Sequence, residues 1–346
     1  MRRRGPPWEI DAMPTTRAEP GRLRRASTSP ALLVLLVAPF FGEGLSGSSP
    51  PGDLLLPWHL AYMVALYGCG ALVCRELAHR SGLGFTGLVL LGVGYAVWEE
   101  ALVDRYWFDP RFWADSGVGG YSVVWHTNLL LAAHLTVFHT AVSVGASVLV
   151  VEWFVPRARH RRWVGRPGLV VAGLVLAVTP VVYGEFDRRP PAGVLVASGA
   201  LLAAVVATAF LVGRRRPPDA ARPAGDPTRP RRGLVLLVAG CACAHWFLTY
   251  TVAQTAVPWP AGVALALLPV AAGLFLVRRL AVTGPYGADG VRVVVGLLVF
   301  LVLLDLLVAL VGRYDMVLAA LVAGWLARRL YTRRASYGTV PAGPTV

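Results

Sequence analysis

The sequence contains no lysine, because all 33 of its basic residues are arginine. Acidic residues are also few, at 19, and charged residues of both signs make up only 15% of the 346 residues. A hydrophobic content of 56% with so little charge excludes an ordinary soluble domain and is typical of repeated membrane spans. Codon bias in a GC-rich genome explains the missing lysine better than any functional need for guanidinium groups.

Cysteine is scarce as well. The four cysteines all lie inside apolar segments, which excludes a disulfide framework, and Cys241-x-Cys243 has neither the redox nor the usual zinc spacing. We expect them to be small core residues. The net charge of +14 does not indicate a nucleic-acid partner, because the arginines lie between apolar runs, where membrane topology accounts for them.

Apolar segments of membrane-spanning length recur along the chain. They cover 31–45, 54–74, 84–104, 128–155, 168–185, 192–213, 233–254, 261–281, 291–312 and 314–331. We therefore predict an all-α fold, a polytopic transmembrane helical bundle of about ten spans. The first segment is short and contains Pro39 and Glu43 before the turn-forming stretch 45–51. It is either a broken helix that lines a cavity or a short tilted anchor.

The arginines predict the orientation of this bundle. If the N-terminus is cytoplasmic, ten spans place all but five arginines on the cytoplasmic side. The five outer ones are Arg105, Arg111, Arg188, Arg189 and Arg313. This bias predicts that both termini are cytoplasmic, and we expect the protein to lie in the plasma (inner) membrane of a prokaryote. The bilayer is its expected partner, and the sequence predicts no oligomeric state.

Composition divides the chain further. An Arg- and Pro-rich stretch is predicted to be a disordered cytoplasmic tail, with Met1 and Met13 as alternative starts. A second Pro- and Arg-rich stretch is predicted to be a cytoplasmic linker between six spans and four. The predicted order is a tail at 1–30, a six-span bundle with the polar cluster at 31–213, a linker at 214–232, four spans at 233–331 and a cytoplasmic tail at 332–346.

Burying an ionisable side chain inside a membrane span costs free energy, so such a residue usually has a function. Glu99 and Glu100 end the third span, the fourth carries His134 and His139, and the first carries Glu43. At 1.5 Å per residue, these groups lie between the middle of the membrane and its outer surface, as do His245 and Asp305. The depth predicts a polar pocket that opens outward. His245 and Asp305 are more often buried hydrogen-bonding residues than ligands.

Helical phase refines this pocket. Glu99 and Glu100 project about 100° apart on a helix, so we expect only one of them to face His139. His139 shares a stripe with small and polar residues such as Ser143, which favours it over His134 as the buried functional histidine. His134 is expected to pack against the aromatic outer loop 105–127, which is either an interfacial hairpin or a lid.

The same residues carry the candidate chemistry. The predicted solute or ion pocket comprises Glu43, Glu99, Glu100, His134 and His139. Glu99, Glu100 and His139 are the catalytic candidates if the protein is an enzyme. No cofactor is required by the sequence, and a divalent metal held by Glu100 and His139 stays an open alternative.

Two resemblances bear on function. The Glu99-Glu100 pair with a histidine in the next span partly resembles the CAAX-protease and bacteriocin-processing family of intramembrane enzymes, which implies metal-dependent hydrolysis. The departure is that Arg105 follows Glu100 by five positions rather than four, and that Leu130 and Leu135, rather than Phe, precede the two histidines at minus four.

The stretch 40–156 resembles an uncharacterised family of prokaryotic multi-pass membrane proteins. The resemblance rests on the segments 42–51, 66–72, 75–77, 99–100, 135–139 and 151–152. It implies no activity, but it implies that Glu43, Glu99, Glu100 and His139 form one constellation. The sequence therefore favours transport of a small solute or ion, coupled to protons. A membrane-embedded metal-dependent hydrolase and a structural membrane protein without chemistry are the alternatives.

Overall fold

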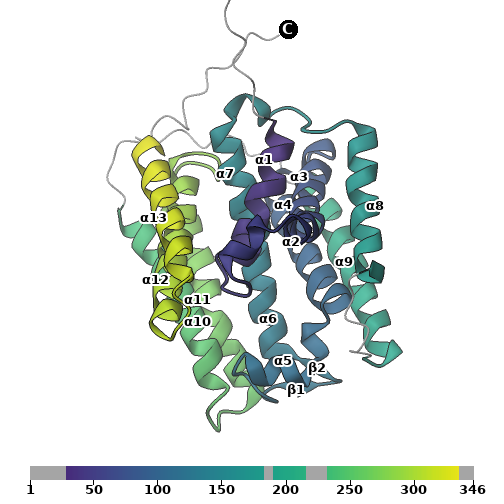
Figure 1. The fold of residues 1–346 in the computed structure, drawn as a ribbon, viewed down its shortest axis with the longest axis vertical. Coiled ribbons are helices and arrows are strands. Elements are labelled where there is room, and N and C mark those ends of the chain that lie inside the picture. Colours follow the sequence, from purple (N-terminus) through teal and green to yellow (C-terminus); the bar gives the residue numbers. More distant parts are fainter. Residues whose placement is uncertain (1–28, 183–189, 216–231, 335–346) are drawn as a thin grey trace, which may run out of the picture.

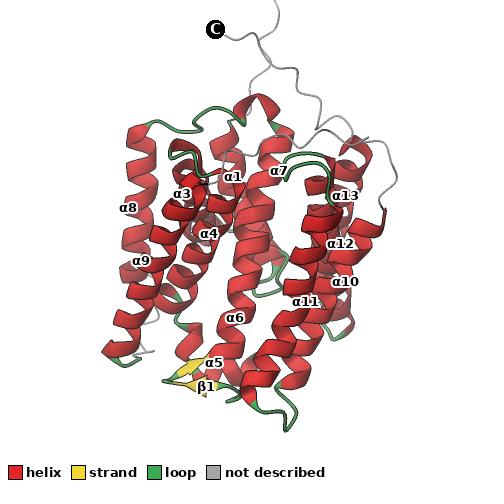
Figure 2. Ribbon diagram, turned by 180° about the vertical axis from the view of Figure 1, so that it is seen from behind, coloured by secondary structure: helices red, strands yellow, loops and turns green. Residues whose placement is uncertain are grey.

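The computed structural model describes residues 29–182, 190–215 and 232–334. Helical rods stand side by side and form nearly the whole of this part (Figure 1; Figure 2). The only strands described are β1 (Val123–Val124) and β2 (Thr127–Asn128), which pair antiparallel. The predicted tail at 1–30, linker at 214–232 and tail at 332–346 lie almost wholly outside the described residues.

The described residues form ten rods, four of which contain a π-helical turn. The four rods with such a turn are α1 (Pro30–Pro39) followed by Phe40–Gly44, α2 (Pro57–Met63) joined through Val64–Gly68 to α3 (Cys69–Arg80), α4 (Gly84–Val97) followed by Trp98–Val103, and α6 (Leu129–Phe138) joined through His139–Ala146 to α7 (Ser147–Phe154). The other six are α8 (Arg166–Val182), α9 (Ala192–Arg215), α10 (Arg232–Val252), α11 (Trp259–Leu280), α12 (Ala288–Leu310) and α13 (Met316–Arg333). A short α5 (Pro110–Asp115) and three 3₁₀ turns lie in the connections, at Pro51–Leu55, Tyr106–Phe108 and Pro156–Ala158.

Each rod occupies the place of one predicted apolar segment. The largest difference is in the second, which runs over 57–80 rather than 54–74. Seven of the described helical stretches are long and apolar enough to cross a membrane. Large apolar side chains such as Val181 and Leu268 are exposed on the outer faces of the rods, as contact with lipid tails requires. The protein is therefore an all-α, polytopic membrane helical bundle.

The bundle has two chemically different ends. At the hairpin end lie α5, β1 and β2, at the bottom of Figure 1. The start of α1 and the end of α13 lie at the opposite end, here called the arginine end (Figure 1). A buried ion network lies there: Glu76 accepts hydrogen bonds from Arg75 (2.7 Å) and Arg80 (2.9 Å), and Arg75 also reaches Glu152 (3.3 Å). The network joins α3 to α7 across the core.

The two largest core clusters define two groups of rods. One draws on α1, α2, α3, α4, α7, α8 and α9, and the other on the turn Phe40–Gly44, α7, α12 and α13. The α6–α7 rod takes part in both, through Val148 in the first and Leu149 in the second. This rod therefore stands between the two groups and presents residues to each of them.

Candidate functional site

The four π-helical turns carry the ionisable residues of the site. Glu43 lies in the first turn, Tyr67 in the second, Glu99 and Glu100 in the third, and His139 begins the fourth. A π-helical turn widens the helix by one residue and is frequent at functional sites. Here the side chains from the four turns contact one another in the half of the bundle that is nearer the hairpin.

His139 is the centre of the cluster. Its Nε2 lies 2.7 Å from Glu100 Oε1, and its Nδ1 lies 3.0 Å from Glu99 Oε2 and 3.0 Å from Ser143 Oγ. Glu99 is completely buried, and Glu100 and His139 are 3% exposed. The prediction that only one glutamate faces His139 is wrong. An imidazole ring has a nitrogen on each side, so one ring between the two carboxylates contacts both despite their different directions on the helix.

Glu43 closes the cluster from the first rod. It accepts hydrogen bonds from Tyr67 OH (2.9 Å) and from Ser49 Oγ. The Tyr67 ring in turn stacks on His139, with a centroid distance of 6.1 Å. The structure thus brings together four of the residues predicted from the sequence, Glu43, Glu99, Glu100 and His139. Their roles stay predictions.

Tyr67 is a site residue that sequence reasoning missed. Its ring lies so close to Gly42 that a Cβ at that position would be 2.3 Å from Tyr67 Cδ1. Tyr95 has the same relation to Gly70, where a Cβ would be 2.1 Å from Tyr95 Cε2. The signal was present as glycines within apolar segments, but only the folded arrangement shows which tyrosine fills each space.

His134 lies outside this cluster. Its Nδ1 is 3.1 Å from His245 Nε2 of α10, and its ring also contacts Tyr250. His245 Nδ1 is 2.7 Å from the carbonyl oxygen of Ala266, so His245 must donate there and accept from His134. Asp305, on α12, is fully buried, and no described residue hydrogen-bonds to its carboxylate oxygens. Within the described part of the chain, no side-chain hydrogen bond or ion pair joins His134, His245 or Asp305 to His139, but His134 and His245 line the same cavity as His139.

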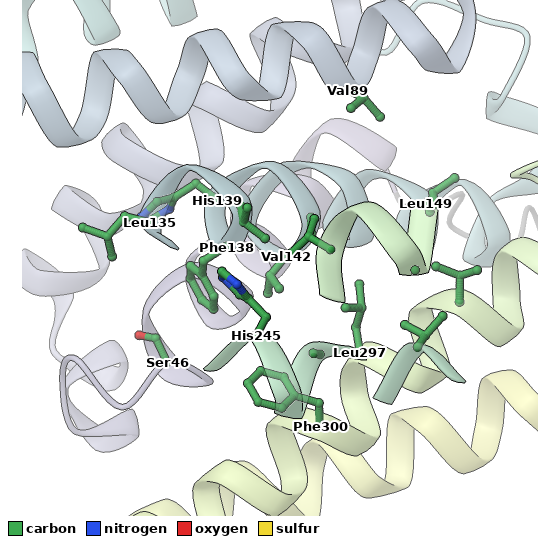
Figure 3. A pocket seen from close by; sticks show the side chains of 18 of the residues that line it. Ser46, Val89, Leu135, Phe138, His139, Val142, Leu149, His245, Leu297 and Phe300 are labelled. Carbon is green, nitrogen blue, oxygen red and sulfur yellow. The ribbon is translucent and has the colours of Figure 1, made fainter. Parts of the chain in front are cut away.

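A cavity of about 1390 Å³ adjoins the cluster. Glu43, Glu100 and His139 line it near the hairpin end, and Arg159 and Arg278 line it at the arginine end. Figure 3 shows the apolar side chains that surround its middle, from the α6–α7 rod and from α12. Ser46 and Ser49 also line it, so the broken end of the first rod borders the cavity. Glu99 is not on the lining and lies behind His139.

The arrangement does not fit a metal centre. Both ring nitrogens of His139 lie within 3.0 Å of carboxylate or hydroxyl oxygens, so neither nitrogen points to open space. The part of the chain that the structure describes holds no group of three or more histidine, cysteine, aspartate or glutamate side chains placed to hold one ion. A zinc site needs three or four such ligands around one point, which Glu100 and His139 alone do not supply.

Fold and site together define an integral membrane protein of the multi-pass helical class, with a buried carboxylate–histidine cluster beside a large cavity. The chain belongs to an uncharacterized membrane protein family, whose profile matches residues 32–332. This confirms the resemblance to an uncharacterised family of multi-pass membrane proteins and extends it beyond 40–156. No curated protein and no solved structure matches the chain.

Proposed function

We propose that the protein transports a small solute across the membrane and couples its movement to protons. The observation that carries the proposal is the buried chain Glu100–His139–Glu99, whose first member lies on the cavity wall. Ionisable groups inside a membrane bundle are costly to bury and commonly mark proton relays and substrate paths. Here two buried carboxylates meet at one imidazole, and a third, that of Glu43, is joined to the imidazole through Tyr67.

The number of protons that the cluster can bind explains how it could couple to a solute. Glu99 and Glu100 together can carry more negative charge than a single imidazole can balance, and unpaired charge in an apolar interior is costly. The cluster therefore holds protons, and a charged solute arriving in the cavity changes how many it holds. His139 takes a proton on one ring nitrogen and releases one from the other, which connects Glu100 at the cavity with Glu99 behind it.

Orientation follows from the arginines. We propose that the arginine end faces the cytoplasm, since the positive-inside rule favours arginine-rich connections there. Both termini are then cytoplasmic, and the carboxylate–histidine cluster lies in the half of the membrane towards the outside. The prokaryotic plasma membrane remains the proposed location. The hydrolase alternative has no comparable support, because the residues that the structure describes do not supply a metal centre.

The test is solute-dependent proton movement. The purified full chain is reconstituted in liposomes that contain a pH-sensitive dye, and a panel of sugars, amino acids, organic acids and organic amines is added outside. We expect at least one solute class to change the internal pH with wild type. Glu100→Gln and His139→Gln should each abolish the change, because each breaks the chain of contacts.

Asp115→Asn is the matched control, because Asp115 is an exposed carboxylate near the hairpin that does not line the cavity. It should behave as wild type. If no solute class moves protons with wild type, or if Glu100→Gln and His139→Gln retain full proton movement, the proposal is wrong.

A further inference from the structure

We propose that the solute is a lipophilic organic cation, a molecule with an apolar body and one positive charge, which binds in the cavity with its charge at Glu100. This inference rests on the proposed transport function and names the substrate class of the same site. Three features of the cavity carry it: its apolar walls, the separation of charges along it, and the free oxygen of Glu100.

The walls select for an apolar body. Phe138, Val142 and Leu149 of the α6–α7 rod and Leu297 and Phe300 of α12 line the middle of the cavity (Figure 3). A hydrophilic solute would lose its hydration there without gaining hydrogen bonds in return, which is costly. An apolar solute instead gains from leaving water. The volume of about 1390 Å³ exceeds the usual range of small-molecule pockets, so there is room for a bulky body.

Charges on the lining select for a cation. Towards the hairpin end the described lining carries the acidic residues Glu43, Glu100 and Asp104. At the arginine end it carries Arg159, Arg278 and Asp289, and Asp289 is paired there with Arg292. A cavity with low-dielectric walls concentrates such a field, so a cation is drawn to the hairpin end and an anion is repelled from it.

Glu100 supplies the point of attachment. Its Oε1 contacts His139, but Oε2 is buried and no described residue hydrogen-bonds to it. Glu100 itself lines the cavity, and a carboxylate with one unpartnered oxygen is complementary to a positive charge. Tyr67 and Phe138 also line this part of the cavity, and aromatic faces attract cations that have lost their water.

Binding of a cation has a consequence for protons. When the carboxyl group of Glu100 holds a proton, the arriving cation replaces it, and the proton leaves through His139 or the cavity. One positive charge is exchanged for another, so the total charge buried in the cluster stays constant. Exchange of a cation for a proton is therefore the form of coupling that this cluster supports.

The test uses two probes of the same shape and opposite charge, tetraphenylphosphonium and tetraphenylborate. Binding of each to the purified full chain in detergent is measured by titration calorimetry, with protein-free micelles as the blank. We expect saturable binding of tetraphenylphosphonium only, with proton release detected as a dependence of the measured heat on the ionisation heat of the buffer.

Variants of Glu100 locate the charge. Glu100→Gln should lower the affinity for tetraphenylphosphonium by roughly tenfold to a hundredfold, because a contact with a charged group is lost. Glu100→Asp should retain part of the affinity, and Asp115→Asn all of it. Should Glu100→Gln fail to fold, wild type is treated with dicyclohexylcarbodiimide, which labels protonated buried carboxyl groups. Mass spectrometry should find the label on Glu100, and tetraphenylphosphonium should block it.

Two outcomes overturn the inference. One is equal binding of tetraphenylborate, and the other is tetraphenylphosphonium binding that neither depends on Glu100 nor protects it from labelling. The proposed function fails separately. If another solute class moves protons in liposomes while tetraphenylphosphonium does not bind, transport stands and the substrate class is wrong. If tetraphenylphosphonium binds at Glu100 but no proton movement is found, the site stands and coupled transport is wrong.

Discussion

Replacing Glu76 with glutamine is expected to destabilise the bundle strongly. Glu76 is completely buried and holds together the ion network at the arginine end. Its Oε1 accepts hydrogen bonds from Arg75 Nη1 (2.7 Å) and from the Trp163 backbone N–H (2.8 Å), and its Oε2 accepts one from Arg80 Nε (2.9 Å). Glutamine keeps one acceptor oxygen and places an amide donor against the donor of Arg80. It also removes the negative charge that balances two arginines.

The magnitude follows from these contacts. A hydrogen bond to a charged group contributes about 1.5–3 kcal/mol, and breaking one side of a buried ion pair costs about 3–5 kcal/mol. We therefore expect Glu76→Gln to lower the free energy of unfolding by about 3–5 kcal/mol. At about 2–4 °C for each kcal/mol, the unfolding temperature should fall by roughly 6 °C or more. The measurement is thermal unfolding of the purified protein in detergent, followed by tryptophan fluorescence.

Asp315→Asn is the control for this experiment. Asp315 pairs with Arg313 at 2.7 Å, but about a third of each side chain is exposed. The hydrogen bond from Arg313 holds the pKa of Asp315 below its ordinary value. Its stabilising effect is therefore present at neutral pH and is lost only as the pH falls through that lowered pKa. Since exposed pairs contribute little, Asp315→Asn should unfold close to wild type at neutral pH. If Glu76→Gln unfolds at the same temperature as Asp315→Asn, the reasoning about the buried network is refuted.

Two further predictions concern Tyr95 and Tyr67. Gly70→Ala should destabilise the protein by about 1–3 kcal/mol, because the new Cβ would meet the Tyr95 ring at 2.1 Å, whereas Gly173→Ala, with open space around it, should not lower the unfolding temperature. An unchanged unfolding temperature for Gly70→Ala would contradict the close packing of that ring. Tyr67→Phe removes the hydroxyl that donates to Glu43 and should lower the free energy of unfolding by about 1–3 kcal/mol. Should Tyr67→Phe unfold as wild type does, the hydroxyl is not a required partner of Glu43.

The rods could be predicted because the length of an apolar run and the thickness of a membrane are directly related. The predicted segments 84–104 and 192–213 agree within two residues with the α4 rod, which ends at Val103, and with α9. The grouping of Glu43 with the other site residues rests on its predicted depth in the membrane and on the family resemblance. It could not come from the spacing, since Glu43 and His139 are separated by 96 positions.

Other features depend on contacts that no local pattern reveals. The phase argument for Glu99 and Glu100 assumed a regular α-helix, but both residues lie in a π-helical turn, and the His139 ring reaches both. The hydrogen bond of Tyr67 to Glu43 and the pairing of His134 with His245 join rods that are far apart in sequence. The way the rods pack decides which side chains meet, and the apolar pattern of a single segment does not predict that packing.

The π-helical turns also have a consequence for the evolution of this family. Such a turn is an α-helix with one inserted residue, and its removal restores a continuous helix. Loss of a single residue within Trp98–Val103 would keep the rod but rotate one part of it by about 100° relative to the other. If the lost residue is Trp98, Glu100 takes the direction that Glu99 had, so at most one of the two carboxylates still faces His139. In an alignment of the family, one-residue gaps at these four turns would mark the members that keep the bundle and have an altered site.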